Sequence, residues 1–521
     1  MRRDTAKLAD AEFDLLVIGG GIYGLCSAWD AAQRGLKVAL VERGDFCGAT
    51  SSNSLKIVHG GLRYLQNLDF PRMRLAISER RTMQRIAPHL VEPLGCVMPV
   101  HRGGPFTRGR IALRTAMAIN DLISAGRNRG LSEAQRLPHG RLISPREFRD
   151  HFPLAPAESL TGAAIWYDAR MQNTERLALC FLHAAVDSGA QAANYLEVTN
   201  LLREDAASPG ARAGASRVIG ARVREVSSGE EFDVRAKLVL NTCGAWTDAL
   251  LQDAGETPGD PVPQSVALNL VLKKPLVGEW ALAIGERTLF FVGWRGRTLA
   301  GTAHFPLPHP LQPPVDGFPV TPEHVDTFLA EINRTYPAAA VTRDDVALVH
   351  GGLLPTEPEA STANGVTILR HHRVADHARS GGPEGLVSVH GVKWTTARAV
   401  AEQTIDLVSK KLGTPTADCR TAETVVPHGP DPLRYEDVAP GLLPGDSGVR
   451  GCDVVCAVRD EMARTLSDVV FRRTPLASAG DPGAAALQRC AVLVATELNW
   501  SPERVQEELA AVHKRLRAGL E

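Results

Sequence analysis

The fold of this chain is decided by residues 14–42, which read DLLVIGGGIYGLCSAWDAAQRGLKVALVE. An apolar run ends at the glycines that begin with Gly19, and a helix-like segment follows them. A second apolar run, residues 37–41, ends on the acidic residue Glu42. Strand, G-x-G-x-x-G turn, helix, strand and acid, in this order, are typical of a βαβ unit that binds a dinucleotide. The sequence therefore predicts an α/β protein that contains a Rossmann-like domain.

Each glycine of the motif has its own expected task. Gly19 and Gly21 allow a tight turn and let the backbone approach a pyrophosphate, whereas Gly24 lets the helix and the strand pack closely. The N–H groups and the dipole at the helix N-terminus favour phosphate, and Glu42 is placed to hydrogen-bond a ribose hydroxyl. A turn that is glycine-rich for steric reasons alone is disfavoured, because strand, helix and acid are all in place. Three neighbouring residues are also expected to contact the cofactor: Ile22, Tyr23 and Arg43.

A second motif, ATSSNSLKIVHGGLRYL at residues 49–65, narrows the choice of cofactor. Small hydroxyl residues beside a pair of glycines allow close approach to a flat ring and supply donors for phosphate or ring oxygens. The motif closely resembles the signature of the FAD-dependent glycerol-3-phosphate dehydrogenases, which are membrane-associated flavoproteins with an amino-acid-oxidase-like fold. In that family this stretch runs under the flavin, and its Leu-Arg-Tyr tip contacts the substrate. The resemblance therefore implies FAD as the cofactor.

Two later segments extend the resemblance. Residues 241–246, NTCGAW, resemble the family's turn near the pyrophosphate, although a strand-to-helix turn that needs glycine would look the same. Residues 391–398, GVKWTTAR, resemble a turn at which a helix N-terminus faces the flavin N1–O2 edge and stabilises the anionic reduced flavin. The resemblance implies further cofactor contacts at Thr50, Ser51, Ser52, Lys56, His59, Gly60, Gly61, Val198 (beside the adenine), Cys243, Gly244, Trp246, Lys393, Trp394 and Thr395.

The same resemblance implies a set of residues that contact the substrate: His59, Arg63, Tyr64, Arg370 and Lys393. Cations in this set would form a basic pocket for a small polar, anionic substrate. Each alone is equally well read as a surface charge, least easily Lys393, which falls in a turn expected to be buried. The general base stays unassigned, because geometry must decide it.

The chain departs from the family pattern at three positions of the expected substrate pocket. Leu354 stands where the family has an arginine that binds the substrate phosphate. Asn269 replaces a histidine, and His304 replaces an aspartate. The segments expected to bind flavin are intact, so FAD is the firmer expectation and glycerol 3-phosphate the weaker one.

Composition limits the class of protein. With 521 residues, 44% of them hydrophobic and 22% charged, the chain is long enough for two or three domains with a sizeable core. A net charge of −1 argues against nucleic-acid binding. The nine cysteines form no C-x-x-C pair, and no second Cys/His pair completes a site with Cys452 and Cys456, so no metal is expected. Neither a transmembrane run nor a signal peptide is evident, which predicts a cytoplasmic protein.

We expect a Rossmann-like FAD-binding domain, an antiparallel-sheet substrate domain and a C-terminal helical domain. Apolar spacing predicts one C-terminal helix over residues 454–469 and another after Ser501, which is a good N-cap. The expected segments are 12–100 (βαβ unit and flavin loop), 101–260 (rest of the FAD domain with interleaved substrate-domain segments), 261–350 (antiparallel sheet), 351–413 (return to the FAD domain), 414–448 (linker) and 449–521 (helical domain).

One segment, residues 108–129, is apolar with arginines at both ends. Such a helix lies in a membrane interface or, equally well from the pattern, in the core. The resemblance favours the interface, because family members dock on membranes through this part of the chain. Peripheral contact with the inner face of the cell membrane is therefore one interpretation, and a homodimer is another open one.

The leading hypothesis is an FAD-dependent dehydrogenase or oxidase. It takes a hydride from a carbinol carbon, or an amine-bearing carbon, to flavin N5 and passes electrons to quinone or oxygen. One alternative is a paralogue that acts on a different polar substrate, and another is a flavin-binding protein without turnover. An NAD-dependent dehydrogenase is disfavoured by the Ser/Thr-rich segment after Glu42.

Overall fold

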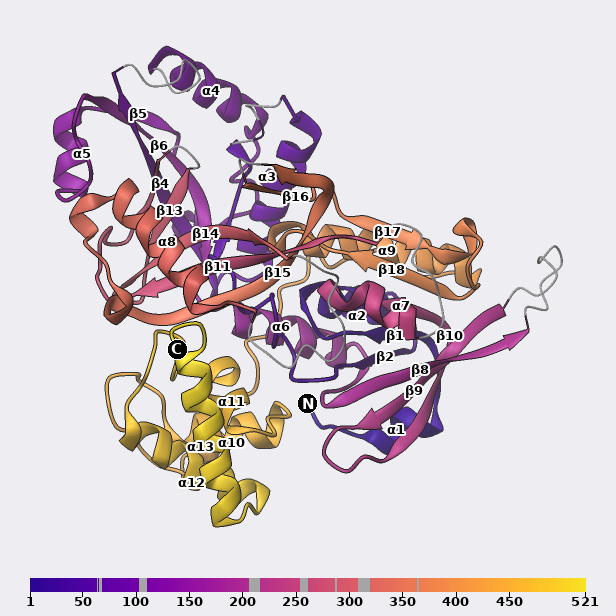
Figure 1. Cartoon of the computed structure of the whole chain (residues 1–521). Helices are drawn as coiled ribbons and strands as arrows, with labels where there is room; N and C mark the ends of the chain where they lie inside the picture. Colours follow the sequence, from indigo (N-terminus) through magenta and orange to yellow (C-terminus); the bar gives the residue numbers. More distant parts are fainter. Residues whose placement is uncertain are drawn as a thin grey trace.

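Two β-sheets and a group of C-terminal helices make up the computed structural model (Figure 1). The structure describes residues 1–62, 64, 68–102, 110–205, 216–253, 261–285, 288–307, 319–362 and 365–521. The expected combination of a dinucleotide-binding sheet, a second sheet and a helical C-terminal region is confirmed.

The first sheet contains the predicted βαβ unit. Its strands follow the order β17-β18-β10-β1-β2-β7, in which the five from β18 to β7 run parallel. The hairpin of β8 and β9 adds on antiparallel to β10. The strands are β1 (Glu12–Ile18), β2 (Val38–Val41), β7 (Gln191–Ala193), β8 (Leu196–Asp205), β9 (Ser216–Glu225), β10 (Glu231–Asn241), β17 (Arg373–Asp376) and β18 (Leu386–His390).

The apolar run in β1 is continuous because both faces of this strand are covered. Leu15 and Val17 pack in one cluster with α2 (Ile22–Gln33), α6 (Thr174–Asp187) and α9 (Ala397–Leu412). Leu16 and Ile18 belong to a second cluster on the other face, which includes residues of the β8–β9 hairpin and Leu8 of α1 (Thr5–Asp10). Parallel strands buried on both faces lack polar alternation, and this is the pattern that the sequence showed.

The second sheet is mainly antiparallel and has the order β16-β15-β11-β14-β13-β12-β4-β6-β3, with β5 beside β6. One pair in it, β12 with β4, is parallel. The helix α8 (Pro322–Thr335) packs on one face, where it meets Leu268 and Leu270. The strands are β3 (Ile57–Val58), β4 (Val91–His101), β5 (Arg141–Ile143), β6 (Leu160–Met171), β11 (Gln264–Leu272), β12 (Ala281–Ile284), β13 (Leu289–Trp294), β14 (Arg297–Pro306), β15 (Val346–Thr362) and β16 (Gly365–Ile368).

This sheet draws strands from outside the segment 261–350 that was expected to form it. β4 and β6 lie in it, and β15 runs past residue 350 along the whole length of β11. Hydrogen-bond partners rather than chain order decide which sheet a strand joins, so the chain crosses between the two sheets several times. The division into six segments stays a prediction.

The remaining described helices lie around the two sheets. Most of them connect consecutive strands, and a short 3₁₀ turn, η8 (Trp394–Thr396), precedes α9. They are α3 (Phe70–Ile86), α4 (Arg110–Ile123), α5 (Pro145–His151) and α7 (Thr247–Asp253).

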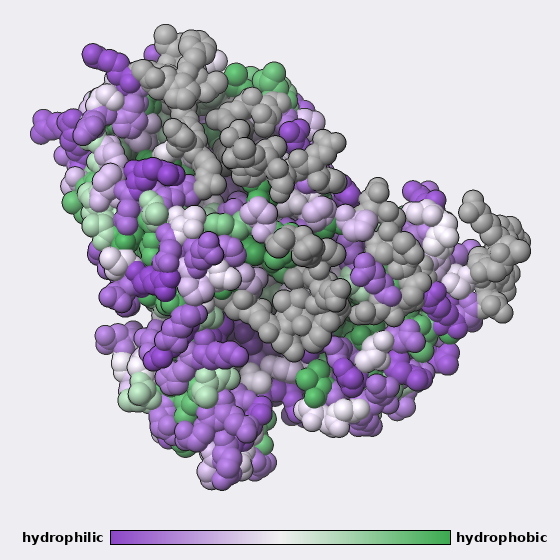
Figure 2. All heavy atoms as spheres, viewed as in Figure 1, coloured by the Kyte–Doolittle hydropathy of each residue, from purple (hydrophilic) through white to green (hydrophobic). Residues whose placement is uncertain are grey.

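The C-terminal helices pack on the opposite face of the second sheet. They are α10 (Gly451–Asp460), α11 (Leu466–Asp468) with the π-helical turn η10 (Val469–Arg473), α12 (Ala484–Leu498) and α13 (Pro502–Arg517). The prediction of one helix over 454–469 is wrong, because Met462 has a positive φ of 57° and Thr465 caps a new helix. Ser501 caps α13 as predicted, with its hydroxyl accepting from the Arg504 N–H. The outer face of these helices is largely hydrophilic (Figure 2).

A buried ion pair connects the C-terminal helices to α6. Both Arg176 and His183 contact the carboxylate of Glu461, at 3.0 Å for Arg176 Nη2 and 3.1 Å for His183 Nε2. Burial alone would raise the pKa of Glu461, but the positive charge of Arg176 and the hydrogen bond with His183 outweigh it and hold the pKa at about 2.

This low pKa predicts acid sensitivity. A carboxylate whose pKa is depressed in the folded state stabilises the protein above its unfolded pKa of about 4.5, and that stability is lost as the pH falls toward 2. We expect Glu461 to account for a loss of about 3 kcal/mol in the free energy of unfolding between pH 6 and pH 2. Denaturant unfolding at several pH values measures it. Glu461→Gln should lower the free energy of unfolding at pH 7 and weaken its dependence on pH between pH 6 and pH 2. Glu521→Gln, in an exposed pair with Arg517, should leave this dependence unchanged. If the free energy of unfolding of Glu461→Gln falls with pH as steeply as that of the wild type, the prediction is wrong.

Candidate functional site

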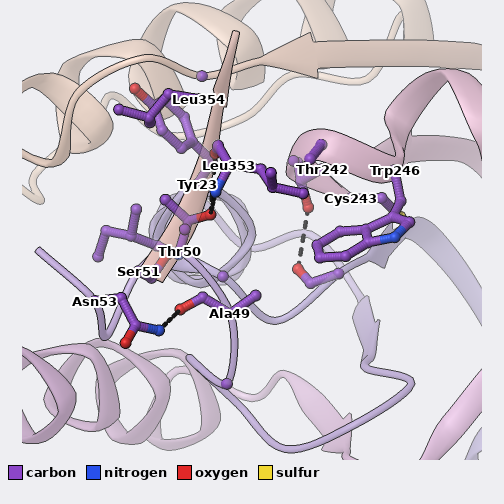
Figure 3. A pocket seen from close by; sticks show the side chains of 18 of the residues that line it. Tyr23, Ala49, Thr50, Ser51, Asn53, Thr242, Cys243, Trp246, Leu353 and Leu354 are labelled. Atoms are coloured by element: carbon purple, nitrogen blue, oxygen red, sulfur yellow. Dashed lines mark hydrogen bonds between the residues drawn. The ribbon is translucent and has the colours of Figure 1, made fainter. Parts of the chain in front are cut away.

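A cavity of about 570 Å³ lies between the two sheets, at the carboxyl ends of β1 and β10. Figure 3 shows Thr50 and Leu354 on one side of it and Thr242, Cys243 and Trp246 on the other. Open α/β sheets bind ligands at this edge. Of the residues predicted to bind the cofactor, the cavity is lined by Gly19, Gly21, Ile22, Tyr23, Glu42, Arg43, Thr50, Ser51, Val198, Cys243, Gly244, Trp246, Lys393 and Trp394.

The three glycines of the motif serve three different purposes. Gly19 has a φ of 103°, which favours glycine, and a Cβ there would also lie 2.8 Å from the carbonyl oxygen of Thr242. A Cβ on Gly24 would lie 1.9 Å from the Gly19 carbonyl oxygen, so this glycine permits the helix to approach the strand. Gly21 caps α2 with an ordinary extended backbone and would bring its Cβ only to within 3.3 Å of Ser51 Oγ. Because Gly21 lines the cavity, its lack of a side chain lets a ligand approach its backbone closely.

Glu42 lies where a ribose-binding acid is expected. Its two carboxylate oxygens accept hydrogen bonds from the N–H groups of Gly20, at 2.6 Å, and Gly44, at 2.8 Å. Burial raises the pKa of this carboxyl group, and these hydrogen bonds oppose the rise. Each carboxylate oxygen has a second lone pair, so Glu42 can still accept from a sugar hydroxyl in the cavity. The residues present thus fit a dinucleotide.

The loop that follows is fastened to the second sheet and to the 391–398 turn. Thr50 accepts a hydrogen bond from the Leu353 N–H at 2.9 Å and donates to the Leu353 carbonyl at 3.0 Å. Ser51 Oγ accepts from the Ile22 N–H, and its carbonyl accepts from Trp394 Nε1. These bonds hold the loop in one conformation across the floor of the cavity.

Tyr23 organises the turn that was expected to face the flavin. Its hydroxyl donates to the carbonyl of Lys393 at 2.9 Å and accepts from the N–H groups of Val392 and Lys393, both at 3.0 Å. Burial raises the pKa of Tyr23 to about 12, so the phenol stays neutral. A Cβ on Gly391 would collide with the Tyr23 ring at 2.1 Å. The hydroxyl of Tyr23 therefore shapes the wall of the cavity through the 391–398 backbone.

Lys56 is placed differently from what the resemblance implied. Its ammonium group is fully buried and donates to Thr174 Oγ1 at 2.8 Å and to Glu175 at 3.1 Å. It also lies 5.1 Å from the ring centroid of Trp294. A buried lysine needs such partners, and they draw the side chain away from the cavity, which it does not line. Six other expected cofactor residues also do not line the cavity: Gly24, Ser52, His59, Gly60, Gly61 and Thr395.

His59 lies beside a buried carboxylate that the motif did not reveal. His59 Nδ1 is 3.2 Å from Asp168 Oδ2, and Asp168 Oδ1 accepts from the Gly60 N–H at 2.6 Å and from Arg80 at 2.7 Å. Burial would raise the pKa of Asp168, but these partners hold it well below its ordinary value. The side chain of His59 is 43% exposed, although neither His59 nor Gly60 lines the cavity.

Lys393 and Tyr64 are brought together, although 329 residues separate them. The Lys393 ammonium group donates to the Tyr64 hydroxyl and lies 4.5 Å from the ring centroid. Arg370 is exposed, and its backbone N–H donates to Glu357 at 2.8 Å. It does not line the cavity, and Arg63 lies outside the described residues. The predicted basic pocket is therefore represented, among the described residues at this end of the cavity, by Lys393.

Two of the three departures from the family pattern lie in the wall of the cavity. Leu354 lines it, and so does Asn269, whose amide is held between the Thr302 hydroxyl at 2.8 Å and the Asn53 carbonyl at 3.1 Å. His304 is not part of the lining. The cavity lining therefore has an apolar side chain and a neutral amide at these two positions.

A metal site is not present in the part of the chain that the structure describes, where no cluster of His, Cys, Asp or Glu could hold an ion. All nine cysteines are free. Burial raises the pKa of most of their thiols, for example that of Cys180 to about 12.

Comparison with known proteins extends these observations. The model of the family described as FAD dependent oxidoreductase matches residues 14–407, and that of the C-terminal domain of alpha-glycerophosphate oxidase matches residues 442–505. The mitochondrial glycerol-3-phosphate dehydrogenase of Macaca fascicularis is 33% identical, over 97% of this chain and 73% of its own length. The glycerol-3-phosphate dehydrogenase of Synechocystis sp. is 29% identical over 98% of both chains. The structure of the Bacillus halodurans glycerol-3-phosphate dehydrogenase complexed with FAD covers 99% of this chain and 97% of its own, with 22% identity and a TM-score of 0.71.

The parallel sheet, the glycine turn and the cavity above it define a dinucleotide-dependent oxidoreductase. Its dinucleotide is FAD. The chain belongs to the FAD-dependent oxidoreductase family that includes the glycerol-3-phosphate dehydrogenases.

Proposed function

We propose that this enzyme oxidises a carbinol carbon of a small polar substrate in the cavity between the two sheets. FAD, when bound, supplies the hydride acceptor at its N5 atom. The observation that carries the proposal is the position of Lys393, which lines the cavity at the turn before α9. The relatives named as glycerol-3-phosphate dehydrogenases support oxidation of an alcohol.

The residues that would hold FAD are those that line the cavity at the carboxyl ends of β1, β2 and β10. The open side of Gly21 and the N-terminus of α2 suit the pyrophosphate. The carboxylate of Glu42 suits a ribose hydroxyl. Arg43 lies 5.8 Å from the ring centroid of Trp246, and this pair borders the region near Val198 that suits the adenine.

Substrate orientation is assigned to Lys393 and Tyr64. A cation whose backbone is fixed by Tyr23 can hold an anionic or hydroxyl group of the substrate at a constant place. His59, which lies outside the cavity lining but is partly exposed, is the candidate for proton removal, because Asp168 holds its Nδ1 side and Nε2 has no bond to any described residue. The carboxylate would stabilise the imidazolium ion that forms.

The nature of the cavity wall bears on the substrate. The phosphate of glycerol 3-phosphate carries close to two negative charges at pH 7, and a single lysine balances them poorly. Leu354 and Asn269 add an apolar and a neutral surface to the same cavity. We therefore propose that a larger or less anionic hydroxy or amine substrate is preferred. The alternative is that Arg63, Arg370 and Lys393 suffice for glycerol 3-phosphate, with Leu354 as a repacked wall.

A substrate panel tests the activity and the substrate together. Anaerobic bleaching of the bound flavin is followed with polyol phosphates, hydroxy acids and amines. We expect slow bleaching with glycerol 3-phosphate and faster bleaching with a less anionic compound. The absence of bleaching with every compound would leave a flavin-binding protein without turnover and would overturn the proposal. Reoxidation with quinone or with oxygen then distinguishes the two proposed electron acceptors.

Replacement of one wall residue provides a sharper test of the substrate. Leu354→Arg should raise kcat/KM for glycerol 3-phosphate about tenfold, since a charge-assisted hydrogen bond to phosphate is worth about 1.5–3 kcal/mol. Leu354→Met, which keeps an apolar wall, is the matched control and should give no gain. Efficient oxidation of glycerol 3-phosphate by the wild type, with no gain in Leu354→Arg, would establish the alternative.

Membrane contact is proposed for α4, which packs on β5 and β6 far from the C-terminal helices in Figure 1. Within the described ranges, no helix is both long and apolar enough to cross a membrane. Ile119 and Leu122 of α4 are 38% and 77% exposed, and Arg114 is exposed beside them. An exposed apolar stripe with a cation suits an anionic membrane surface. Arg127, one of the flanking arginines, is instead buried and paired with Asp121.

This assignment predicts binding to vesicles. The protein should sediment with anionic liposomes and be released at high salt. Arg114→Glu and Leu122→Glu should each reduce the bound fraction several-fold, whereas Leu433→Glu, at an exposed leucine outside α4, should not. Equal recovery of all forms in the supernatant would contradict the prediction. Residues 103–109 and the side chains of 110–113 lie outside what the structure describes.

A further inference from the structure

An arginine of the C-terminal helices reaches the cavity. Arg472 belongs to η10 and lines the cavity together with residues 42–45 and 48–51. Its side chain is 15% exposed, whereas that of its neighbour Arg473 is 0% exposed. The FAD-dependent oxidoreductase model ends at residue 407, so Arg472 comes from a part of the chain beyond that domain.

Two carboxylates fix the guanidinium group of Arg472. Its Nε donates to Asp45 Oδ2 at 2.5 Å, and its Nη2 donates to Asp468 Oδ1 at 2.6 Å. Its Nη1 has no hydrogen bond to any described residue. A planar guanidinium held along one side in this way presents its remaining N–H groups in a fixed direction.

The two carboxylates, of Asp45 and Asp468, also accept hydrogen bonds from other residues of the protein. Asp45 also accepts from Arg473, at 2.6 and 2.7 Å, and from Asn194 at 2.9 Å. Asp468 also accepts from the Tyr195 hydroxyl at 2.7 Å and from two backbone N–H groups. Burial alone would raise the pKa of Asp45, but the two arginines keep it well below its ordinary value. The group that remains for a ligand at this place is therefore the donor, Nη1.

The place of Arg472 in the cavity indicates which ligand group it would meet. It borders the cavity beside Gly44 and Gly48, which follow the ribose-binding position Glu42 in the sequence. The glycine turn, which suits a pyrophosphate, is joined to this loop by the hydrogen bond that the Ile22 N–H donates to Ser51 Oγ. A donor with positive charge here is complementary to the phosphate-bearing half of a dinucleotide.

We propose that Arg472 is a cofactor-binding residue, which donates a hydrogen bond to the ADP half of FAD and makes docking of the C-terminal helices part of cofactor retention. The inference rests on FAD as the cofactor and goes beyond the proposed reaction. Because Asp45, Asn194 and Tyr195 connect the same helices to the FAD domain, cofactor binding and docking stabilise one another.

The test measures binding without turnover. Apoprotein of the full chain is titrated with FAD and, separately, with ADP, and the melting temperature of each apoprotein is recorded. In Arg472→Met, Asp45 keeps its bonds to Arg473, and Asp468 keeps those to Tyr195 and the backbone, so the fold should persist. We expect the Kd of this variant to rise about tenfold or more for FAD and for ADP.

Arg473→Met is the matched control, because Arg473 binds the same carboxylate but does not line the cavity. It should lower the melting temperature of the apoprotein more than Arg472→Met does and leave the Kd of the folded protein near the wild-type value. If Arg472→Met does not fold, Arg472→Gln, which keeps a donor toward Asp45, carries the same comparison.

Three results would overturn the inference. Unchanged FAD affinity in Arg472→Met shows that the residue makes no contact, and an equal loss in Arg473→Met shows that only docking matters. A loss of affinity for FAD with no loss of affinity for ADP would place the contact outside the ADP half of the cofactor. A wild-type apoprotein that takes up no FAD would instead refute the cofactor itself, so the two failures are distinguishable.

Discussion

Gly21→Val is expected to give a folded, colourless protein. The backbone of Gly21 has φ and ψ of −76° and 178°, which valine adopts without strain. The added methyl groups would occupy the cavity at the point where the N-terminus of α2 faces the expected pyrophosphate. We expect the Kd for FAD to rise by at least about a hundredfold, because close backbone approach is lost. The ratio of flavin to protein absorbance after purification measures it.

The other glycines of the motif provide the controls for this prediction. Gly21→Ala adds only a Cβ 3.3 Å from Ser51 Oγ and should retain part of the flavin. Gly24→Ala should fail to fold or should melt much earlier, since its Cβ would overlap the Gly19 carbonyl at 1.9 Å. Gly21→Val protein that is yellow, with a wild-type content of FAD, would show that the glycine turn does not carry the cofactor.

Lys393→Met is expected to retain FAD and to lose turnover. Lys393 lines the cavity, and its backbone carbonyl and N–H are both hydrogen-bonded to the Tyr23 hydroxyl, which also accepts from the Val392 N–H. Methionine keeps the length of the chain but has no charge and no donor. Loss of a positioned polar group at a reacting centre lowers rates by about 10²–10⁴-fold. The rate of anaerobic flavin bleaching by the best substrate measures the effect apart from the electron acceptor.

Two variants separate charge from position at this residue. Lys393→Arg should keep substrate binding better than turnover, because a longer, planar group moves the charge. Tyr64→Phe removes the hydroxyl that accepts from the lysine and should have a smaller effect than Lys393→Met. A wild-type bleaching rate in Lys393→Met would show that this residue takes no part in the reaction. Loss of bound FAD together with the loss of rate would show that its role is structural.

The dinucleotide-binding unit was predictable because its information is local. The apolar runs of β1 and β2, the glycines between them and Glu42 lie within about thirty residues, and the spacing alone orders strand, turn, helix and acid. The resemblance of residues 49–65 and 391–398 then added FAD. Within these segments the structure brings Thr50, Ser51 and Trp394 to the cavity as expected.

Other outcomes depended on partners far away in the sequence. Lys56 lies inside the flavin motif, yet Glu175 and Thr174 draw its ammonium group into the core. Arg370 is exposed rather than placed in the cavity lining, and the hydrogen bond to Glu357 is made by its backbone N–H. Similarity of motif does not reveal where a side chain finds its charge partner.

By itself, then, the sequence determined the class of fold, the cofactor and the glycine turn that we propose to hold it. Only the tertiary structure decided which residues share the site: Asp168 meets His59 across 109 residues, and Arg472 meets Asp45 across 427. The physical reason is that a strand or a capped turn is specified by neighbours in the chain. A buried charge, in contrast, is stable only where folding supplies an opposite charge and hydrogen bonds, and these come from any part of the chain.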